Sequence, residues 1–507
     1  MLLLFSLLAA RLITNPLGGG ARSITPTPTP RNGIGIETVT ITENHHSEKI
    51  NIGIADGQHV QFESPTNSAE VCIDGANPQN NPNNDVPTVI VVTTLSNTSV
   101  DKGDSLDIGN EELQGICLWQ KDFQKYNHTS EPLRVLVANI GTKETNVLDT
   151  TVPLVTGQII KFAASHPKNF LGVVGFSFSQ SVQDAMGTLN ANHIPVISPA
   201  ASSSDFSAEW AYFNRVIPSN QLQGDIAATY AKGVLHATTA FVFLDTKTNP
   251  YSKTLGISFI NELRSDGSSV TPEYYTVNDP ATFDNGINDV LTKYREGSGP
   301  AVVFCSCYAS DFVALHKWQG KTIPKGLIFM GGEGLYELGS YSGNYTDIYF
   351  TAYAYPDTIK ILCQGQQESQ CTQEQENFLA DYCQQFDPQD YKLDTVKLQY
   401  CGKYGVSRPG PHVIQTYDAI SALQQAYNQA KKTVQAPSKE NIQSALNQLS
   451  FEGISGQINL TQGDPNNKAI LVLCVDSNHL THLVGVYGQF FQNSSSQPQI
   501  SLDNVCA

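Results

Sequence analysis

Charged residues are scarce in this sequence. Asp, Glu, Lys and Arg make up 15% of its 507 residues, against roughly a quarter in an average soluble protein, and Asn, Gln, Ser and Thr supply much of the polarity instead. The charges are also one-sided, because 47 Asp and Glu outnumber 30 Lys and Arg and give a formal net charge of −17. Since a chain this acidic repels the phosphate backbone, we exclude nucleic acid as a partner.

Long apolar runs are absent as well. The apolar stretch Met1–Ala10 ends at Arg11, short of the roughly 18 to 20 residues that a membrane-spanning helix needs. Its length is that of the apolar part of a signal peptide, but it lacks a basic start and a clear cleavage site. It is therefore interpreted either as a truncated signal or anchor, or as a buried or frayed N-terminus.

Residues 18–35 alternate Thr with Pro after three Gly, which is typical of an extended spacer. For residues 1–35 we favour a truncated signal or anchor followed by a Thr/Pro stalk. This predicts an exported protein, extracellular or at the cell surface, where its N-terminus is either a cleaved signal or a membrane anchor.

Familiar catalytic and cofactor motifs are missing too. The chain contains no HExxH helix, no GxSxG elbow, no GxxxxGK[ST] loop and no GxGxxG opening a helix. Its cysteines form neither CxxC pairs nor a Cys/His zinc spacing. We therefore expect no enzyme, no cofactor and no metal. Scattered Ser, His and Asp residues leave an extracellular α/β hydrolase as a remote alternative.

The cysteines that are present number ten, an even count, which in an exported protein predicts several disulfides. Four of them, Cys363, Cys371, Cys383 and Cys401, lie in a polar, Gln-rich stretch. Cross-links there would hold an excursion of the chain that is otherwise weakly constrained. The alternative is a set of free thiols in a reducing compartment.

Apolar strands alternate with helical patterns from residue 86 onward. Strands are expected at 87–95, 134–140, 171–178 and 194–199, and a second series at 240–245, 300–306 and 325–330. Short strands that are apolar throughout belong to parallel sheets covered on both faces. The pattern therefore predicts an α/β fold with two doubly wound parallel-sheet lobes joined by a hinge.

The lobes are expected to exchange segments of the chain. Helices at 413–430 and 438–449 and strands at 469–475 and 483–488 follow the second series and must complete one lobe or both. We assign residues 86–212 and 355–465 to lobe 1, and 213–354 and 466–507 to lobe 2. The Asn-rich residues 36–85 are interpreted as an irregular β-rich leader, so that the whole N-terminal extension is weakly ordered.

Several blocks then carry a family resemblance. GVVGFSFSQSVQDAMGTLNANHIPVISPAASSSDFS (172–207) and FNRVIPSNQLQGDIAA (213–228) are followed by FLDTKTNPYSKTLGISFINEL, GLIFMGGEGLYE and TYDAISALQQAYNQA. In this order they resemble the type I periplasmic binding proteins, in the branch that binds branched-chain amino acids for ABC transporters. The resemblance covers roughly 87–488. The Cys-rich insertion and the lack of a lipobox cysteine near the N-terminus depart from that family.

The first lobe supplies one half of the implied site. Ser179 lies where a strand ends and a helix begins, so that unpaired amides there suit a carboxylate; the resemblance implies that this position holds the ligand carboxylate, whereas the residues alone fit an ordinary helix cap equally well. The resemblance also places Ser202, with Ala200 and Ala201, beside the ligand. A solvated turn is the alternative for these three residues.

The second lobe supplies the other half. Glu333 follows an apolar strand at the sheet edge where open α/β folds bind ligands, and its carboxylate can hold an ammonium group. The resemblance implies that the rings of Tyr251 and Tyr308 wall the cleft. An exposed loop glutamate and two ordinary half-buried tyrosines are the alternatives.

Together these residues predict a clamp for an amino acid, an amide or a similar small polar molecule. We interpret the chain as an exported solute-binding protein that closes on its ligand by hinge motion and passes it to an ABC permease. The alternative is the ligand-sensing ectodomain of a membrane-anchored receptor with a signalling partner.

Overall fold

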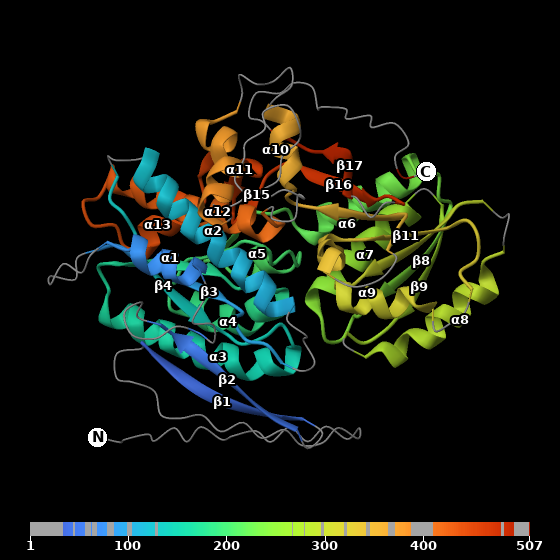
Figure 1. The fold of residues 1–507 in the computed structure, drawn as a ribbon, viewed down its shortest axis with the longest axis horizontal. Coiled ribbons are helices and arrows are strands. Elements are labelled where there is room, and N and C mark those ends of the chain that lie inside the picture. The colour runs from blue at the N-terminus through green and yellow to red at the C-terminus, as the bar shows by residue number, and fades with distance from the viewer. Residues whose placement is uncertain are drawn as a thin grey trace.

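Short apolar strands followed by helices build two separate sheets in the computed structural model, one in each of two lobes (Figure 1). The structure describes residues 34–43, 46–55, 62, 68–78, 86–98, 104–126, 130–265, 267–277, 279–295, 299–318, 322–340, 345–363, 371–386, 409–477, 481–490 and 506. The expected signal or anchor at 1–10 and nearly all of the stalk lie outside these residues.

The first lobe has a seven-stranded sheet in the order β1-β2-β4-β3-β5-β6-β7. Five strands are parallel: β3 (Thr88–Thr93), β4 (Arg134–Asn139), β5 (Phe170–Gly175), β6 (Val196–Ser198) and β7 (Phe213–Arg215). At one edge, β2 (His46–Ile54) pairs antiparallel with β4, and β1 (Gly35–Glu43) pairs antiparallel with β2. Successive strand residues face opposite sides, so both faces of this sheet need a cover.

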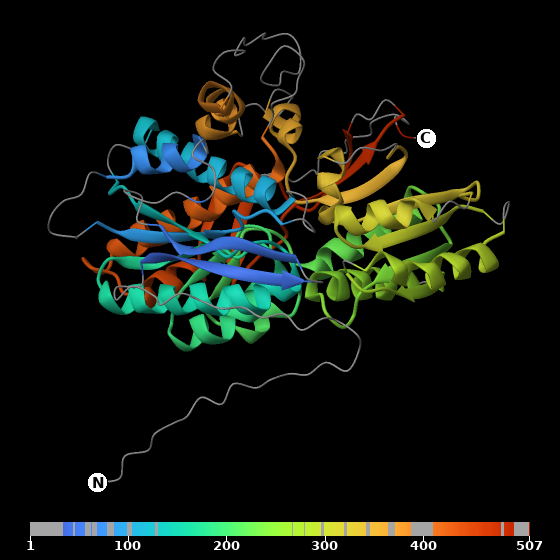
Figure 2. The same cartoon turned by 60° about the horizontal axis from the view of Figure 1, so that its bottom comes forward.

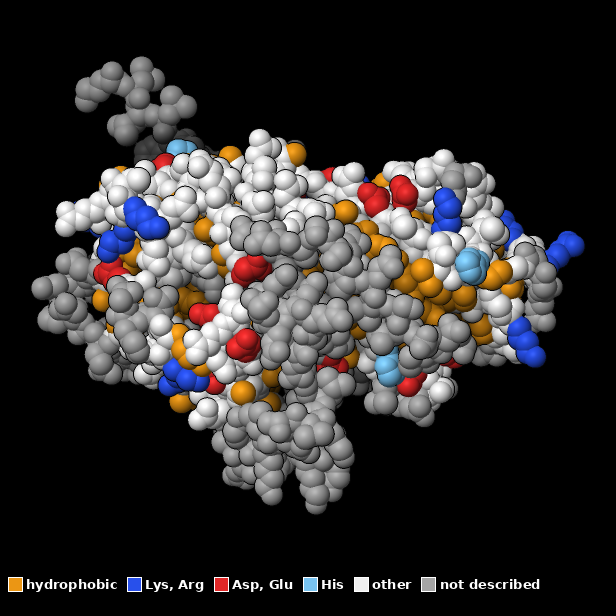
Figure 3. All heavy atoms as spheres, turned by 90° about the horizontal axis from the view of Figure 1, so that it is seen from above, with side chains coloured by type: hydrophobic (Ala, Val, Ile, Leu, Met, Phe, Trp, Pro, Cys, Tyr) orange, Lys and Arg blue, Asp and Glu red, His pale blue; other side chains and the backbone are white. Residues whose placement is uncertain are grey.

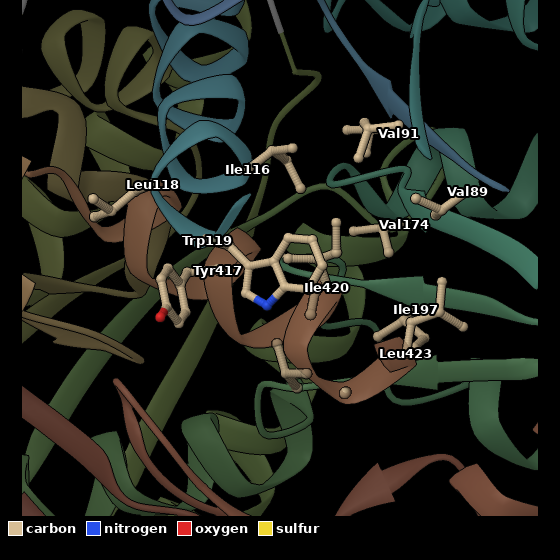
Figure 4. Packing of buried hydrophobic residues seen from close by; sticks show 14 of the residues in the cluster. Val89, Val91, Ile116, Leu118, Trp119, Val174, Ile197, Tyr417, Ile420 and Leu423 are labelled. Atoms are coloured by element: carbon tan, nitrogen blue, oxygen red, sulfur yellow. The ribbon is translucent and has the colours of Figure 1, made fainter. Parts of the chain in front are cut away.

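Helices provide that cover on both faces. One face carries α1 (Ser68–Ala76), α2 (Asp104–Tyr126), α12 (Pro411–Lys431) and α13 (Lys439–Leu446), and the other carries α3 (Thr145–Ser165) and α4 (Ser179–Ala191). Val91 faces the α2 and α12 side with Ile116 and Ile420 (Figure 4). Its neighbour Val92 belongs to the apolar cluster on the α3 side. The short α5 (Phe206–Glu209) precedes β7, and α10 (Pro356–Cys363) and α11 (Gln373–Phe386) lead back into this lobe.

Residues 36–85 differ from the irregular leader that the sequence suggested. They include the regular β1–β2 hairpin and α1, both of which join the first lobe (Figure 2). The physical reason is alternation, since Val39, Ile41, Ile50 and Ile52 are buried on one face of the hairpin.

The second lobe has its own seven-stranded sheet, in the order β17-β16-β12-β11-β10-β8-β9. Five of its strands are parallel: β8 (Thr239–Leu244), β9 (Ser269–Tyr274), β10 (Ala301–Ser306), β11 (Leu327–Gly331) and β12 (Ile348–Ala352). At one edge, β16 (Ile470–Val475) pairs antiparallel with β12, and β17 (Thr481–Tyr487) pairs antiparallel with β16. One face packs on α6 (Asn220–Gly233) and α7 (Pro250–Arg264), and the other on α8 (Phe283–Lys293), α9 (Ala309–His316) and the 3-10 segment η3 (Glu333–Ser340). A second 3-10 turn, η1 (Pro280–Thr282), precedes α8. The predicted fold class is confirmed, with antiparallel strands added at the edge of each sheet.

The chain crosses between the lobes after β7, after β12 and after the small sheet β13 (Ser450–Gly453), β14 (Gly456–Thr461) and β15 (Asp464–Pro465). Arg215, whose side chain is fully buried, links two of these crossings. Its Nε donates to Asp464 at 2.6 Å and its Nη1 to the carbonyl of Ser203 at 2.7 Å. The crossings are therefore bonded to each other and to a cleft loop.

Several disulfides are present, as the cysteine count predicted. Cys72 bonds Cys117, Cys305 bonds Cys307 and Cys474 bonds Cys506. Cys371 and Cys383 are also disulfide-bonded, whereas Cys401 and the side chain of Cys363 lie outside what the structure describes.

The described helices and the surface were compared with two expectations from the sequence, the lack of long apolar runs and the low content of charged residues. No helix within the described ranges is long and apolar enough to cross a bilayer. On the face shown in Figure 3, Lys, Arg, Asp and Glu appear as isolated spots among polar and apolar groups, as expected for a chain with 15% charged residues.

Candidate functional site

A cavity lies in the cleft between the two lobes. It measures about 40 Å³, room for a few water molecules. Its described lining comprises Ile108, Lys143, Ser177, Phe178, Ser179 and Ala200 from the first lobe, Tyr251, Tyr308, Glu333, Gly334 and Glu337 from the second, and His412 from α12. The fold therefore brings five of the predicted site residues to one cavity.

The first-lobe wall is the turn from β5 into α4. Gly175 makes it possible, because its φ is +135° and a Cβ there would stand 2.0 Å from the carbonyl oxygen of Val92. Ser179 is the first residue of α4, after the capping position at Phe178, so it is not the ordinary cap that the residues alone allowed. Its Oγ accepts a hydrogen bond from the backbone amide of Ser203 at 3.2 Å. No acceptor for the Ser179 hydroxyl proton lies among the residues that the structure describes.

The loop after β6 lies next to this turn. The Ser198 hydroxyl donates to the carbonyl of Phe176 at 3.0 Å and accepts from the amide of Ala201 at 2.9 Å. Ala200 lines the cavity. Ala201 and Ser202 are both buried in the same loop but are not among the residues lining the cavity.

The second-lobe wall is aromatic. Tyr251 and Tyr308 stack with ring centroids 5.3 Å apart, and the edge of Phe178 meets Tyr308 from the first lobe at 6.2 Å. The hydroxyl oxygen of Tyr251 accepts from the amide of Gly334 at 3.1 Å. This hydrogen bond holds the start of η3, so Tyr251 supports the segment that carries Glu333.

Glu333 is the first residue of η3, two residues after β11 ends, and is 6% exposed. Gln415 of α12 donates a hydrogen bond to its Oε1. Burial raises the pKa of Glu333 to about 7, although the charge of His412 and the Gln415 hydrogen bond oppose the rise. The carboxyl group is thus poised to ionise when a cation lies beside it.

Further acidic groups surround Glu333. Nε2 of His412 lies 3.2 Å from Oε1 of Glu337; burial lowers the pKa of this imidazole, but its hydrogen bond to Glu337 and the neighbouring carboxylates outweigh burial and raise the pKa to about 10. Burial raises the pKa of Glu111 to about 7 and also raises that of Glu112, both on α2. Glu333 therefore lies in a cluster of buried carboxyl groups that holds the His412 imidazole in its charged form.

Sequence reasoning missed Lys143, Phe178, Glu337, His412 and Gln415. His412 and Gln415 lie at the start of α12, about 80 residues after Glu333 in the chain. The only sequence signal was Pro411 at the first helical position, which marks the helix start. No cluster of His, Cys, Asp or Glu within the described ranges has the arrangement of a metal site.

The pKa of Glu333 leads to a pH prediction. Because that pKa lies above its ordinary value of 4.5, the Glu333 contribution to the free energy of unfolding should be greatest below about pH 4.5 and fall as pH rises to about 7. Glu333→Gln cannot titrate, so its urea midpoints should fall less than those of the wild type between about pH 5 and pH 7. Equal slopes would show that Glu333 ionises normally in the folded protein.

Comparisons with known proteins place this geometry in context. The family model described as the receptor family ligand binding region matches residues 121–478. A search of curated proteins gave no match.

Solved structures share the fold. The leucine-binding protein LivK of Thermotoga maritima superposes with a TM-score of 0.60 at 18% identity, covering 80% of this chain and 99% of its own. LivJ of Streptococcus pneumoniae, solved with isoleucine, gives 0.58 at 15% identity with coverage of 80% and 99%. A Rhodopseudomonas palustris solute-binding protein, in complex with 3,4-dihydroxybenzoic acid, gives 0.58 at 12% identity with coverage of 81% and 100%.

Proposed function

Because the chain belongs to the family of receptor ligand-binding regions, we propose that it is an exported solute-binding protein that captures an amino acid or amide between its lobes. The resemblance to type I periplasmic binding proteins is confirmed by the family match over residues 121–478 and by structural neighbours that include LivK. One observation carries the proposal. Ser179 and the start of α4 meet Glu333 across a single cavity, so groups suited to an anion and to a cation face each other.

The ligand would be held by its two ends. Its carboxylate would accept hydrogen bonds from the Ser179 hydroxyl and from the first amides of α4, where the helix dipole favours negative charge. Its ammonium group would lie against Glu333, and its body would contact the stacked rings of Tyr251 and Tyr308. Ala200 would shape the wall, with Ala201 and Ser202 supporting its loop from behind.

Entry requires the lobes to part, because about 40 Å³ is too small for an amino acid. Contacts across the cleft would break on opening, among them Phe178 with Tyr308 and the 3.5 Å pair of Lys253 with Asp205. Three chain crossings form a hinge about which two compact lobes can swing.

The chemistry supports an amino acid over an aromatic acid. The structural neighbours include proteins solved with isoleucine and with 3,4-dihydroxybenzoic acid. A benzoate has no ammonium group to place beside Glu333, whereas an α-amino acid has one. We further propose that the loaded protein delivers its ligand to an ABC permease and performs no catalysis itself.

A receptor ectodomain is the second candidate, favoured by the description of the matched family as a receptor ligand-binding region. The two roles differ in the membrane protein that the chain should bind and in whether that binding depends on the ligand. A transport protein should bind permease subunits more tightly when loaded with ligand, as measured by co-purification from the source membrane. A receptor should instead remain attached to a membrane signalling protein in both states.

An amino-acid ligand should stabilise the protein. At 100 times its dissociation constant, a ligand that binds only the folded form adds about 2.7 kcal/mol to the free energy of unfolding. A thermal-shift screen of amino acids, amides and benzoates, followed by calorimetry, measures this effect. If only benzoates stabilise the protein, the carboxylate half of the proposed site stands, and the role proposed for Glu333 is wrong. No shift with any of these compounds would contradict the proposed ligand class.

A further inference from the structure

A second cavity lies within the first lobe and shares no lining residue with the cleft. It is bordered by α2, the start of α11, α12 and the β13–β14 hairpin, and measures about 170 Å³. An engineered protein cavity of about 150 Å³ admits benzene, so this one has room for a small organic molecule. Trp119 of α2 and Tyr417 of α12 lie side by side between the two helices (Figure 4).

The walls of this cavity are rich in aromatic rings. Five such residues line it: Trp119, Phe123, Tyr126, Tyr417 and Phe451. Trp119 and Phe123 are one helical turn apart, with ring centroids separated by 5.3 Å and planes tilted by 33°. The faces of such rings attract cations, and Trp attracts them most strongly.

The charge of the lining has one sign. Its acidic residues are Asp122, Glu374, Asp418 and Glu452, and none of the described residues that line it is Lys, Arg or His. The hydroxyl of Tyr417 donates to Asp122 Oδ2 at 3.1 Å, which ties a carboxylate to an aromatic wall. A ring set combined with carboxylates is the chemistry that binds organic ammonium ions.

Two lysines lie close to these walls and pair with other groups, and one of them, Lys125, also lies over the Tyr126 ring, with Nζ 4.7 Å from the ring centroid. Lys125, whose charge acts on Asp122, lies 2.8 Å from Asp381. Lys468, whose charge acts on Asp418, donates to the hydroxyl of Ser455 at 2.8 Å. Neither lysine is among the residues that line the cavity.

A buried acceptor in the same wall points to a ligand. Gln424 lines the cavity and is 3% exposed. Its Nε2 lies 3.0 Å from Oδ1 of Asn428 and 3.5 Å from the carbonyl of Glu131, two acceptors that fix the orientation of the amide. Its Oε1 has no hydrogen-bond partner among the described residues. A ligand with a hydroxyl or N–H donor would satisfy this oxygen.

We propose that this cavity is a binding site for a small organic ammonium ion that also carries a hydroxyl or N–H group. The ammonium would lie among the rings and the Asp122 carboxylate, and its donor would reach Gln424. This site is distinct from the cleft, so it goes beyond the function proposed above.

Choline is a suitable probe, because it combines a quaternary ammonium with a hydroxyl. Its neutral carbon isostere, 3,3-dimethyl-1-butanol, has nearly the same shape without the charge. Calorimetric titration of the full chain should show choline binding at least about tenfold tighter than the alcohol. Equal affinities, or no choline binding, would overturn the proposal.

Variants locate the binding. Asp122→Asn and Phe451→Leu should each weaken choline binding by about tenfold, whereas Glu333→Gln in the cleft and Glu440→Gln on the surface of α13 should leave it unchanged. Phe451 is only half-buried, so its variant remains informative if Asp122→Asn does not fold. Loss of choline binding in Glu333→Gln, with retention in Asp122→Asn and Phe451→Leu, would place the cation in the cleft and refute a second site.

Discussion

Glu333→Gln should lower the affinity for an α-amino ligand by about 1 to 3 kcal/mol, which is about fivefold to 150-fold. The change preserves shape and can keep a hydrogen bond with Gln415, but it removes the charge that would face the ammonium group. The free energy of unfolding should not fall, because burying a neutral amide costs less than burying a carboxylate. Calorimetry with the tightest-binding amino acid, together with urea unfolding, measures both quantities.

Matched variants make this result specific. Glu440 on α13 is half exposed and pairs with His193 at the surface, so Glu440→Gln removes the same charge far from the cleft and should leave affinity unchanged. A carboxylic acid without an amine should bind Glu333→Gln at least as well as it binds the wild type. Equal affinity of wild type and Glu333→Gln for the amino acid would mean that Glu333 is only a buried loop residue.

The sequence was most informative where a strand ends. The apolar runs at 134–140 and 300–306 became β4 and β10 with boundaries within one residue or so. Ser179 and Glu333 each follow such a strand, and parallel strands deliver their carboxyl ends to one edge of a sheet. That rule, together with the family resemblance, is why both could be expected at the cleft before the fold was known.

The sequence was less informative where contacts with other elements decide the structure. The β1–β2 hairpin was obscured by its polar outer face and by the Asn-rich residues that follow it. Likewise, His412 and Gln415 have the composition of an exposed helix start, and only the docking of α12 against η3 turns them toward Glu333 and Glu337. Polar residues on a helix reveal no partner until the neighbouring element is known.

The second cavity illustrates the same limit. Trp119 lies on α2 and Tyr417 on α12, and both belong to the main apolar cluster of the first lobe. Their rings also border a space lined by carboxylates, between α2, α12 and the β13–β14 hairpin. Periodicity places a ring toward the core but does not show whether the core is filled there.

The disulfide between Cys72 and Cys117 should make the largest single contribution to stability among the changes considered. It closes a loop across 45 residues, and restricting the unfolded chain over that length is worth about 4 kcal/mol. It also fastens α1 to α2, the helix that carries Trp119 and Glu111. The double variant Cys72→Ala/Cys117→Ala should therefore unfold at a markedly lower urea concentration while keeping its affinity for the cleft ligand, since neither cysteine lines the cavity.

Reduction provides the control. A reductant breaks this bond in the wild type and cannot affect it in the double variant, so the difference between the two proteins should shrink to the small cost of two truncated side chains. Wild type and double variant should each lose whatever the other disulfides contribute. A wild-type protein that is no more stable than the double variant under oxidising conditions would mean that Cys72 and Cys117 are thiols in solution, and the prediction of export would lose its support from this pair.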